Sequence, residues 1–145
     1  MYIHQISVFI ENKPGNIADF TNFLAENNID MRAFQIADTS DYGIIRIIVD
    51  DPFNTLTLLK DNNWICKLTH VIGFKIPDKP GAMAKVMGIL ASENISVDYV
   101  YAFLSRGTED ALMVFRVNDS ETDRVVQLLV KNGMKMISQE DLENM

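Results

Sequence analysis

Hydrophobic and polar side chains alternate along residues 5–10, which is the period-2 pattern of a strand with one buried face. A Lys-Pro-Gly motif at 13–15 interrupts this pattern, and hydrophobic residues then recur at helical spacing from Ile17 to Leu24. Pro14 suits the first turn of a helix, where a missing backbone N–H costs nothing. The pattern therefore predicts a strand, a tight corner and an amphipathic helix.

The following segments continue the alternation of extended and helical patterns. Residues 30–37 and 44–49 are typical of strands, and the polar segment 39–43 between them predicts a hairpin. The Asp-Asp-Pro motif at 50–52 opens a second amphipathic helix, and residues 64–76 form an almost unbroken extended run. The succession is strand, helix, hairpin, helix, strand.

This succession occurs twice. The motif Lys13-Pro14-Gly15 recurs as Lys79-Pro80-Gly81, an offset of 66 residues, and His4, Ile10 and Ile29 are among the other positions that carry the same residue at this offset. The strand at 44–51 aligns with 112–119 at an offset of 68. The second copy is therefore expected to have two extra residues in the turn around 105–108.

The second copy repeats the helical signals. Residues 83–90 carry an apolar stripe, and a second helix is expected to start after a cap at Asp119 or Ser120 and to end at Gly133. We therefore predict an α+β protein with two ferredoxin-like βαββαβ units at 1–69 and 70–145. Each unit would be a four-stranded antiparallel sheet with both helices on one face. Because no flexible linker separates the copies, they are expected to pack in a fixed relation.

Charge narrows the range of partners. The formal net charge of −7 and the pI of about 4.7 repel phosphate backbones and anionic lipid surfaces, so we expect neither nucleic acid nor a membrane as partner. No stretch of the sequence is apolar over the length that spans a bilayer, and the first residues are not typical of a signal peptide. We expect a cytoplasmic protein. The single cysteine, Cys66, suits a reducing compartment.

The two Pro-Gly corners are the candidate chemistry. Backbone N–H groups at the start of a helix have no partner inside it and lie at the positive end of its dipole, so they suit a carboxylate. Gly15 and Gly81 let a ligand approach the backbone, and Asn12 and Asp78 precede the corners as possible partners for an amino group. The alternative is that each corner is only a tight turn, which many Pro-Gly pairs are.

The phrases ENKPGNIADFTNFLAENNIDM and PDKPGAMAKVMGILASENISV resemble the opening β-α-β of the ACT domain, a module that senses amino acids in metabolic enzymes and regulators. The resemblance covers nearly the whole chain, twice. It implies that an amino acid binds between two units, where the first corner of one unit faces the start of the second strand of its partner. It also implies a regulatory protein, since nothing in this chain resembles the catalytic domain to which such modules are normally attached.

Carried onto this sequence, the resemblance implies two sites. One comprises Asn12, Gly15, Asn16 and Ile17 facing Ser96 and Val97, and the other comprises Asp78, Gly81, Ala82 and Met83 facing Asp30 and Met31. Asn12 is the amide that serine-binding members often carry at this position. Asp78 departs from it and places a negative charge near the ligand carboxylate. We therefore expect the two sites to be unequal.

Other chemistry is weaker in this sequence. His4 and His70 occupy equivalent positions, but neither has further ligands at metal spacing, so no metal or cofactor is predicted. Cys66 lies in a predicted strand and is interpreted as a packed thiol. An acylphosphatase-like enzyme would need an arginine cradle where this chain has Lys13 and Lys79, and an RNA-binding sheet would need exposed aromatic residues among basic ones. No catalytic residue is predicted.

Three functions remain open. The first is a tandem ACT protein that binds a free amino acid and transmits an allosteric change to a regulated enzyme or another protein partner. The second is an interaction module with no ligand, and the third is a small enzyme on a ferredoxin-like scaffold. A homodimer is one assembly that the sequence allows.

Overall fold

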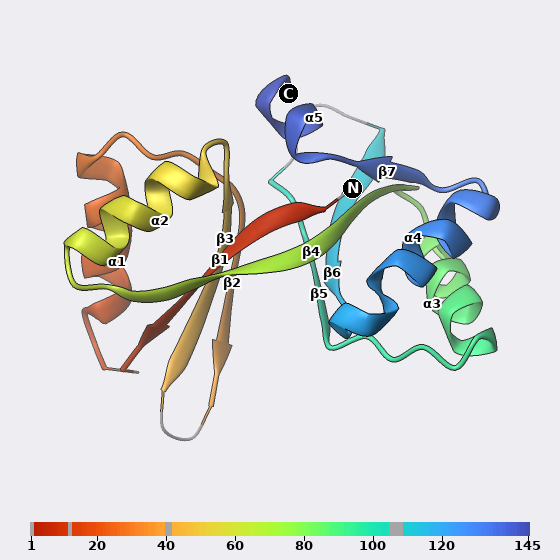
Figure 1. Cartoon of the computed structure of the whole chain (residues 1–145), viewed down its shortest axis with the longest axis horizontal. Helices are drawn as coiled ribbons and strands as arrows, with labels where there is room; N and C mark the ends of the chain where they lie inside the picture. Colours follow the sequence, from red (N-terminus) through yellow and green to blue (C-terminus); the bar gives the residue numbers. More distant parts are fainter. Residues whose placement is uncertain (1, 12, 40–41, 105–108) are drawn as a thin grey trace. The chain divides into compact units, whose positions relative to one another are not determined.

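The computed structural model describes residues 2–11, 13–39, 42–104 and 109–145. It divides into two compact units, which we call the N-terminal unit, His4–Thr69, and the C-terminal unit, His70–Met145 together with Met1–Ile3. The elements of the N-terminal unit are β1 (Ile3–Ile10), α1 (Asn16–Glu26), β2 (Met31–Asp38), β3 (Gly43–Val49), α2 (Pro52–Asp61) and the first part of β4 (Ile65–Pro77). Figure 1 shows these elements in sequence colours.

The N-terminal unit is a four-stranded sheet in the order β2-β3-β1-β4. The hairpin partners β2 and β3 are antiparallel, with Phe34 opposite Ile47, and β3 is antiparallel to β1, with Ile6 opposite Ile47. A register shift between Met31 and Ala33 interrupts the start of β2. Both helices lie over the same face of this sheet in Figure 1. This arrangement confirms the ferredoxin-like prediction for the first copy.

The C-terminal unit repeats this topology. Its elements are the second part of β4, α3 (Ala82–Ser92), β5 (Tyr99–Ala102), β6 (Asp110–Arg116), a short 3-10 helix η1 (Asp119–Glu121), α4 (Thr122–Lys131), β7 (Lys135–Ile137) and α5 (Gln139–Glu143). The strand β4 pairs with β6 on one side and β7 on the other, and β5 pairs with β6, all antiparallel. The order β7-β4-β6-β5 corresponds to that of the N-terminal unit. The repeat in the sequence is therefore a repeat of the fold.

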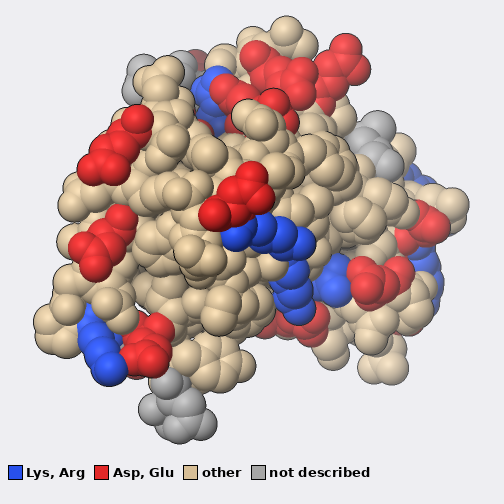
Figure 2. Space-filling view, turned by 60° about the vertical axis from the view of Figure 1, so that its left-hand side comes forward, with Lys and Arg blue, Asp and Glu red and all other residues tan. Residues whose placement is uncertain are grey.

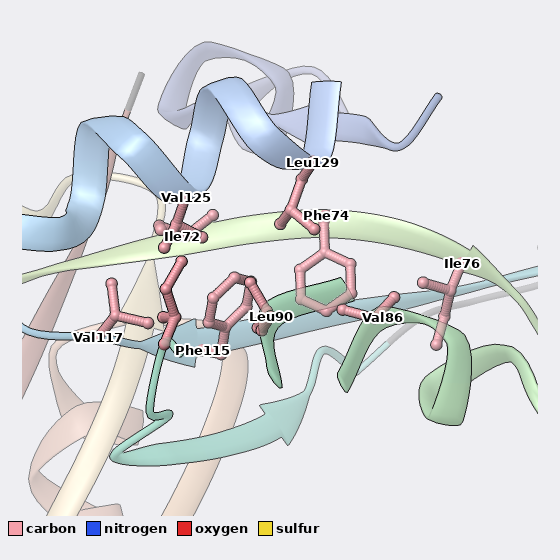
Figure 3. Packing of buried hydrophobic residues seen from close by; sticks show 10 residues of the cluster. Ile72, Phe74, Ile76, Val86, Leu90, Phe115, Val117, Val125 and Leu129 are labelled. Carbon is pink, nitrogen blue, oxygen red and sulfur yellow. The ribbon is translucent and has the colours of Figure 1, made fainter. Parts of the chain in front are cut away.

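Each unit has its own hydrophobic core between its helices and its sheet. Figure 3 shows Val125 and Leu129 of α4 and Val86 and Leu90 of α3 directed at the strand residues beneath them. At the centre, the rings of Phe74 and Phe115 meet edge to face, with their centroids 4.9 Å apart. The N-terminal core is built in the same way, from Phe20, Leu24 and Leu59 of α1 and α2 packed against apolar strand residues. The apolar stripes of the sequence face these cores.

The structure differs from the sequence predictions at the start of α4. Neither Asp119 nor Ser120 caps α4. The side chain of Asn118 instead accepts a hydrogen bond from the Ser120 backbone N–H at 3.0 Å and caps the 3-10 turn that precedes α4. Because this turn tightens the chain, α4 begins only at Thr122. Gly133, with φ of 80°, follows the last turn of α4 as predicted.

The C-terminal helix α5 is a second difference, because the repeat did not predict it. Ser138 and Asp141 form a reciprocal capping box, in which each side chain accepts a hydrogen bond from the backbone N–H of the other. Hydrogen bonding of the carboxylate to Ser138, first to its backbone N–H and then to its side chain, lowers the pKa of Asp141, and the positive charge of Lys75 lowers it further to a smaller extent. The first copy has no counterpart of this helix, so an offset comparison could not reveal it.

Two predicted features fall outside the described residues. The centre of the β2–β3 turn, at 40–41, and the extra residues at 105–108 are not described. In the part of the chain that is described, no helix has the length and apolar character needed to cross a membrane.

Gly73 of β4 offers a test of the packing in the C-terminal unit. A Cβ atom at this position would overlap Cδ1 of the buried Ile3 and lie 3.2 Å from Cβ of Ile137. We expect Gly73→Ala to lower the free energy of unfolding by about 1–3 kcal/mol through overpacking. Urea denaturation followed by circular dichroism measures this change.

The matched control is Gly88→Ala in α3, where an added Cβ meets no atom within 4 Å. Alanine is favoured over glycine inside a helix, so this variant should gain about 0.5–1 kcal/mol. Equal effects of the two substitutions would contradict the packing described around Gly73.

Candidate functional site

The two Pro-Gly corners have the same backbone geometry. Gly15 and Gly81 adopt φ of 91° and 90°, in the left-handed region that glycine occupies without strain. In both corners the residue after the glycine donates its N–H to the carbonyl of the lysine, from Asn16 to Lys13 at 3.2 Å and from Ala82 to Lys79 at 3.3 Å. The chain therefore changes from strand to helix by the same turn twice.

The helices that start at these corners differ from α2 and α5 in their capping. The helix α4 also lacks a side-chain cap, but a 3-10 turn precedes it. No side-chain hydrogen bond caps α1 or α3 among the described residues, whereas Asp51 caps α2 and Ser138 caps α5. The first carbonyl that an α1 amide reaches is that of Gly15, which accepts from Asp19 at 2.9 Å, and Gly81 accepts likewise from Lys85 at 3.0 Å. Asn16 and Ala82 use their N–H groups within the corner, whereas the next two N–H groups of each helix have no carbonyl partner inside the helix. An anion is favoured at such a helix start.

Each corner borders a cleft within its own unit. The N-terminal cleft has a volume of about 230 Å³, and the C-terminal cleft, which includes Gly81 and Ala82, has a volume of about 550 Å³. Glu11 at the N-terminal cleft is paired with Lys13 at 2.6 Å. The ion pair lowers the pKa of Glu11 and raises the pKa of Lys13. Both side chains are exposed, so the pair contributes little to stability.

The structure places the predicted site residues on both ends of the first helix of each unit. In the N-terminal unit Gly15, Asn16 and Ile17 lie at the start of α1, and Asp30 and Met31 follow its end. A helix of 11 residues is about 16 Å long, so neither group can share a small ligand with the other. Asn12 lies outside the described residues.

The C-terminal unit has the same separation. Asp78, Gly81, Ala82 and Met83 lie at the start of α3, and Asp78 is exposed and does not line the C-terminal cleft. Ser96 and Val97 follow α3 but precede β5, which begins at Tyr99. Each unit therefore presents half of the predicted residue set at each end of its helix.

The corner of the N-terminal unit is braced by a side chain. Asn16 donates a hydrogen bond from Nδ2 to the carbonyl oxygen of Glu11 at 2.7 Å, across the residue that the structure does not describe. Ala82 occupies the equivalent position in the other unit and has no group to make this bond. The amide of Asn16 thus supports the turn, a role that the sequence analysis did not assign to it.

The histidines and the cysteine pack against neighbours in their own units. The ring of His4 meets the edge of Phe53 at 4.9 Å, and His70 stacks on Tyr2 at 5.3 Å. The Cys66 thiol donates to the Trp64 carbonyl at 3.7 Å, and partial burial raises its pKa. A raised pKa disfavours the thiolate, which agrees with a packed thiol.

Four lysines were missed by the sequence analysis. Lys75, Lys79, Lys85 and Lys135 all line the C-terminal cleft. Only Lys79 stood out in the sequence, as part of the repeated motif, and none of the four was predicted to belong to a site. Two of the other lysines could have been found from the repeat. At the offset of 66 residues, Lys75 corresponds to Phe9 and Lys85 corresponds to Asp19, so each is a basic residue where the first copy has none. Lys135 comes to this cleft through the pairing of β7 with β4.

Comparison with known proteins agrees with the fold and the repeat. The family model described as ACT domain pair matches residues 1–145. No curated protein matches the sequence significantly. Among solved structures, protein BT0572 from Bacteroides thetaiotaomicron is similar with a TM-score of 0.88 and 34% identity, covering 100% of this chain and 98% of that chain.

More distant structures share the fold. The regulatory subunit of aspartate kinase from Thermus thermophilus, in its ligand-free form, has a TM-score of 0.61 at 15% identity and covers 89% of this chain and 91% of that chain. Aspartokinase III from E. coli, in complex with aspartate and ADP, has a TM-score of 0.56 at 17% identity over 90% of this chain and 32% of that one. With its two equivalent corners and a family match over its full length, this chain belongs to the ACT domain family, as an ACT domain pair.

Proposed function

We propose that this chain is a regulatory or sensor protein that binds a free amino acid at its Pro-Gly corners and has no catalytic activity of its own. Each unit, with the boundary near Thr69, acts as one ACT domain in this proposal. The observation that carries it is the identical left-handed corner in both units, at Gly15 and Gly81, each opening a helix without a side-chain cap. Such a helix start offers backbone donors to a carboxylate.

The placement of the remaining residues supports a site that needs two units. The corner and the start of the second strand lie at opposite ends of a helix about 16 Å long, so a ligand that contacts both must lie between one unit and another. We propose that Ser96 and Val97 complete the site of the Gly15 corner, and Asp30 and Met31 that of the Gly81 corner. The second unit comes from this chain or from another copy.

Transmission of the signal follows from this design. A ligand held by two units stabilises one arrangement of them over others, and its differential affinity sets how far the equilibrium shifts. We propose that a partner enzyme or regulator reads this arrangement in the cytoplasm. The regulatory subunit of aspartate kinase from Thermus thermophilus has the same fold.

A thermal-shift screen of the full chain against the free amino acids tests ligand binding. An amino acid at about a hundredfold its dissociation constant should stabilise the protein by about 2.7 kcal/mol and raise Tm by roughly 5–10 °C. The expected result is a shift with one amino acid or a small group of them. A flat screen would favour an interaction module with no ligand.

Substitution of Ala18, an exposed residue in the first turn of α1, tests the corner. Ala18→Glu places a negative charge beside the backbone donors and should weaken amino-acid binding at least about tenfold, because a like charge roughly 5 Å away costs a few kcal/mol at an effective dielectric near 20. The charge interacts well with the helix dipole, so stability should not fall. Isothermal titration calorimetry measures the affinity.

The matched control is Ala25→Glu, the same exposed substitution at the other end of α1. It should change the affinity less than twofold.

Ala84→Glu makes the equivalent change in α3. Loss of binding in Ala84→Glu but not in Ala18→Glu would move the ligand to the other corner, and unchanged binding in both would remove the corners from the site. Asn12→Ala tests the amide that the family resemblance assigns.

A further inference from the structure

The C-terminal cleft is lined by an unusual concentration of positive charge. Among the described residues around it, Lys75, Lys79, Lys85 and Lys135 are basic and Asp110 is the only acidic one. The whole chain has a net charge of −7, and acidic side chains are widespread on the face shown in Figure 2. The cleft is therefore positively charged in a protein whose net charge is negative.

The equivalent cleft of the N-terminal unit has the opposite charge. It is lined by Glu11 and Asp19, and no lysine or arginine is among its described lining residues. At the repeat offset, Glu11 corresponds to Pro77 and Asp19 to Lys85. The change from Glu11 to Pro77 removes a negative charge from the cleft. It also removes an ion-pair partner, because Glu11 pairs with Lys13 in the N-terminal corner whereas Pro77 offers no such partner to Lys79. The same fold thus supports an acidic cleft in one unit and a basic one in the other.

The strand register brings two of these lysines together. Lys75 of β4 lies directly opposite Lys135 of β7 in the antiparallel pair. Like charges directly opposite in a sheet are destabilising. None of the four lysines forms an ion pair with a carboxylate in the described part of the chain, and the Asp141 carboxylate near Lys75 is held by Ser138 at 2.7 Å. Among the described residues this repulsion has no compensating ion pair, although the charge of Asp141 interacts with that of Lys75.

We propose that the C-terminal cleft binds a small molecule that carries phosphate groups, with Lys75, Lys79, Lys85 and Lys135 as its ligands. A phosphate group carries a charge of about −1.5 to −2 at pH 7, so two such groups match four lysines, whereas a carboxylate neutralises only one. The volume of about 550 Å³ lies in the usual range for small-molecule sites. The start of α3, including Gly81, lines the same cleft, and the positive end of the helix dipole favours an anion there.

This proposal does not depend on amino-acid binding at the N-terminal corner. It assigns a second class of ligand to the cleft beside the Gly81 corner, where this ligand would compete with an amino acid bound at that corner. A regulatory chain of this kind would respond to two different chemical signals. The acidic surroundings act against long polyanions such as nucleic acid, which would extend beyond the cleft. A compact phosphate compound fits the basic area alone.

Inorganic pyrophosphate is the probe, titrated into the full chain by isothermal titration calorimetry, with citrate as a carboxylate of comparable charge. We expect saturable binding of pyrophosphate at least tenfold tighter than that of citrate. In ¹H–¹⁵N spectra, the amide signals of Gly81, Ala82 and Gly133 should shift, because these residues line the cleft. Absence of heat and of shifts at 10 mM pyrophosphate, or tighter binding of citrate, would overturn the proposal.

The decisive variant is Lys75→Gln with Lys135→Gln, which removes the opposed pair. The matched control is Lys60→Gln with Lys67→Gln, two exposed lysines of the N-terminal unit that do not line the cleft. Pyrophosphate affinity should fall at least tenfold in the first variant and change less than twofold in the control. Equal loss in both would show a response to net charge only and would overturn the site.

Folding and the amino-acid site are checked with the same variants. Because Lys75→Gln with Lys135→Gln removes a repulsion, its Tm should stay the same or rise by about 1–4 °C, so weaker binding cannot be attributed to unfolding. Ala18→Glu should leave pyrophosphate binding unchanged. Loss of pyrophosphate binding in Ala18→Glu would overturn the assignment to the C-terminal cleft.

Discussion

A strand that ends beneath a helix must reverse its path within a few residues, and in this protein a single left-handed glycine performs that reversal in each unit. With φ near 90° at Gly15 and Gly81, the next residues enter the helix at once, and the apolar side of the helix meets the sheet. A residue with a Cβ atom would be strained in this conformation. Because the residue at the N-cap is glycine, it supplies no capping side chain to the helix start.

The same corner supports two different chemical environments. Packing constrains the apolar side of α1 and α3 through residues such as Leu24 and Leu90, which the repeat preserves. The charged side chains at each cleft have no such constraint, because they lie outside the hydrophobic cores. Charge could therefore change there from Asp19 in one unit to Lys85 in the other while the fold remained the same. We infer that the pair combines two specificities on one scaffold.

The order of elements could be predicted from the sequence, because periodicity reports directly which face of a segment is buried. The strand β4, the hairpin of β2 and β3 and the glycine after α4 all follow the pattern. The cap that precedes α4 could not be predicted, because Asn118, Asp119 and Ser120 all suit an N-cap. Only the backbone path selects Asn118, which caps the 3-10 turn and not α4 itself. The helix α5 has no copy in the first half to reveal it.

The candidate site also has a part that could be predicted from the sequence and a part that could not. The local sequence determined the glycine corners, the helix starts and the apolar stripes, because each depends on residues within one turn of chain. Only the tertiary structure decided that Lys75 and Lys135 lie opposite each other and share a cleft with Lys85. These residues are up to 60 positions apart, so strand pairing and helix packing, which act over long distances in sequence, bring their charges together.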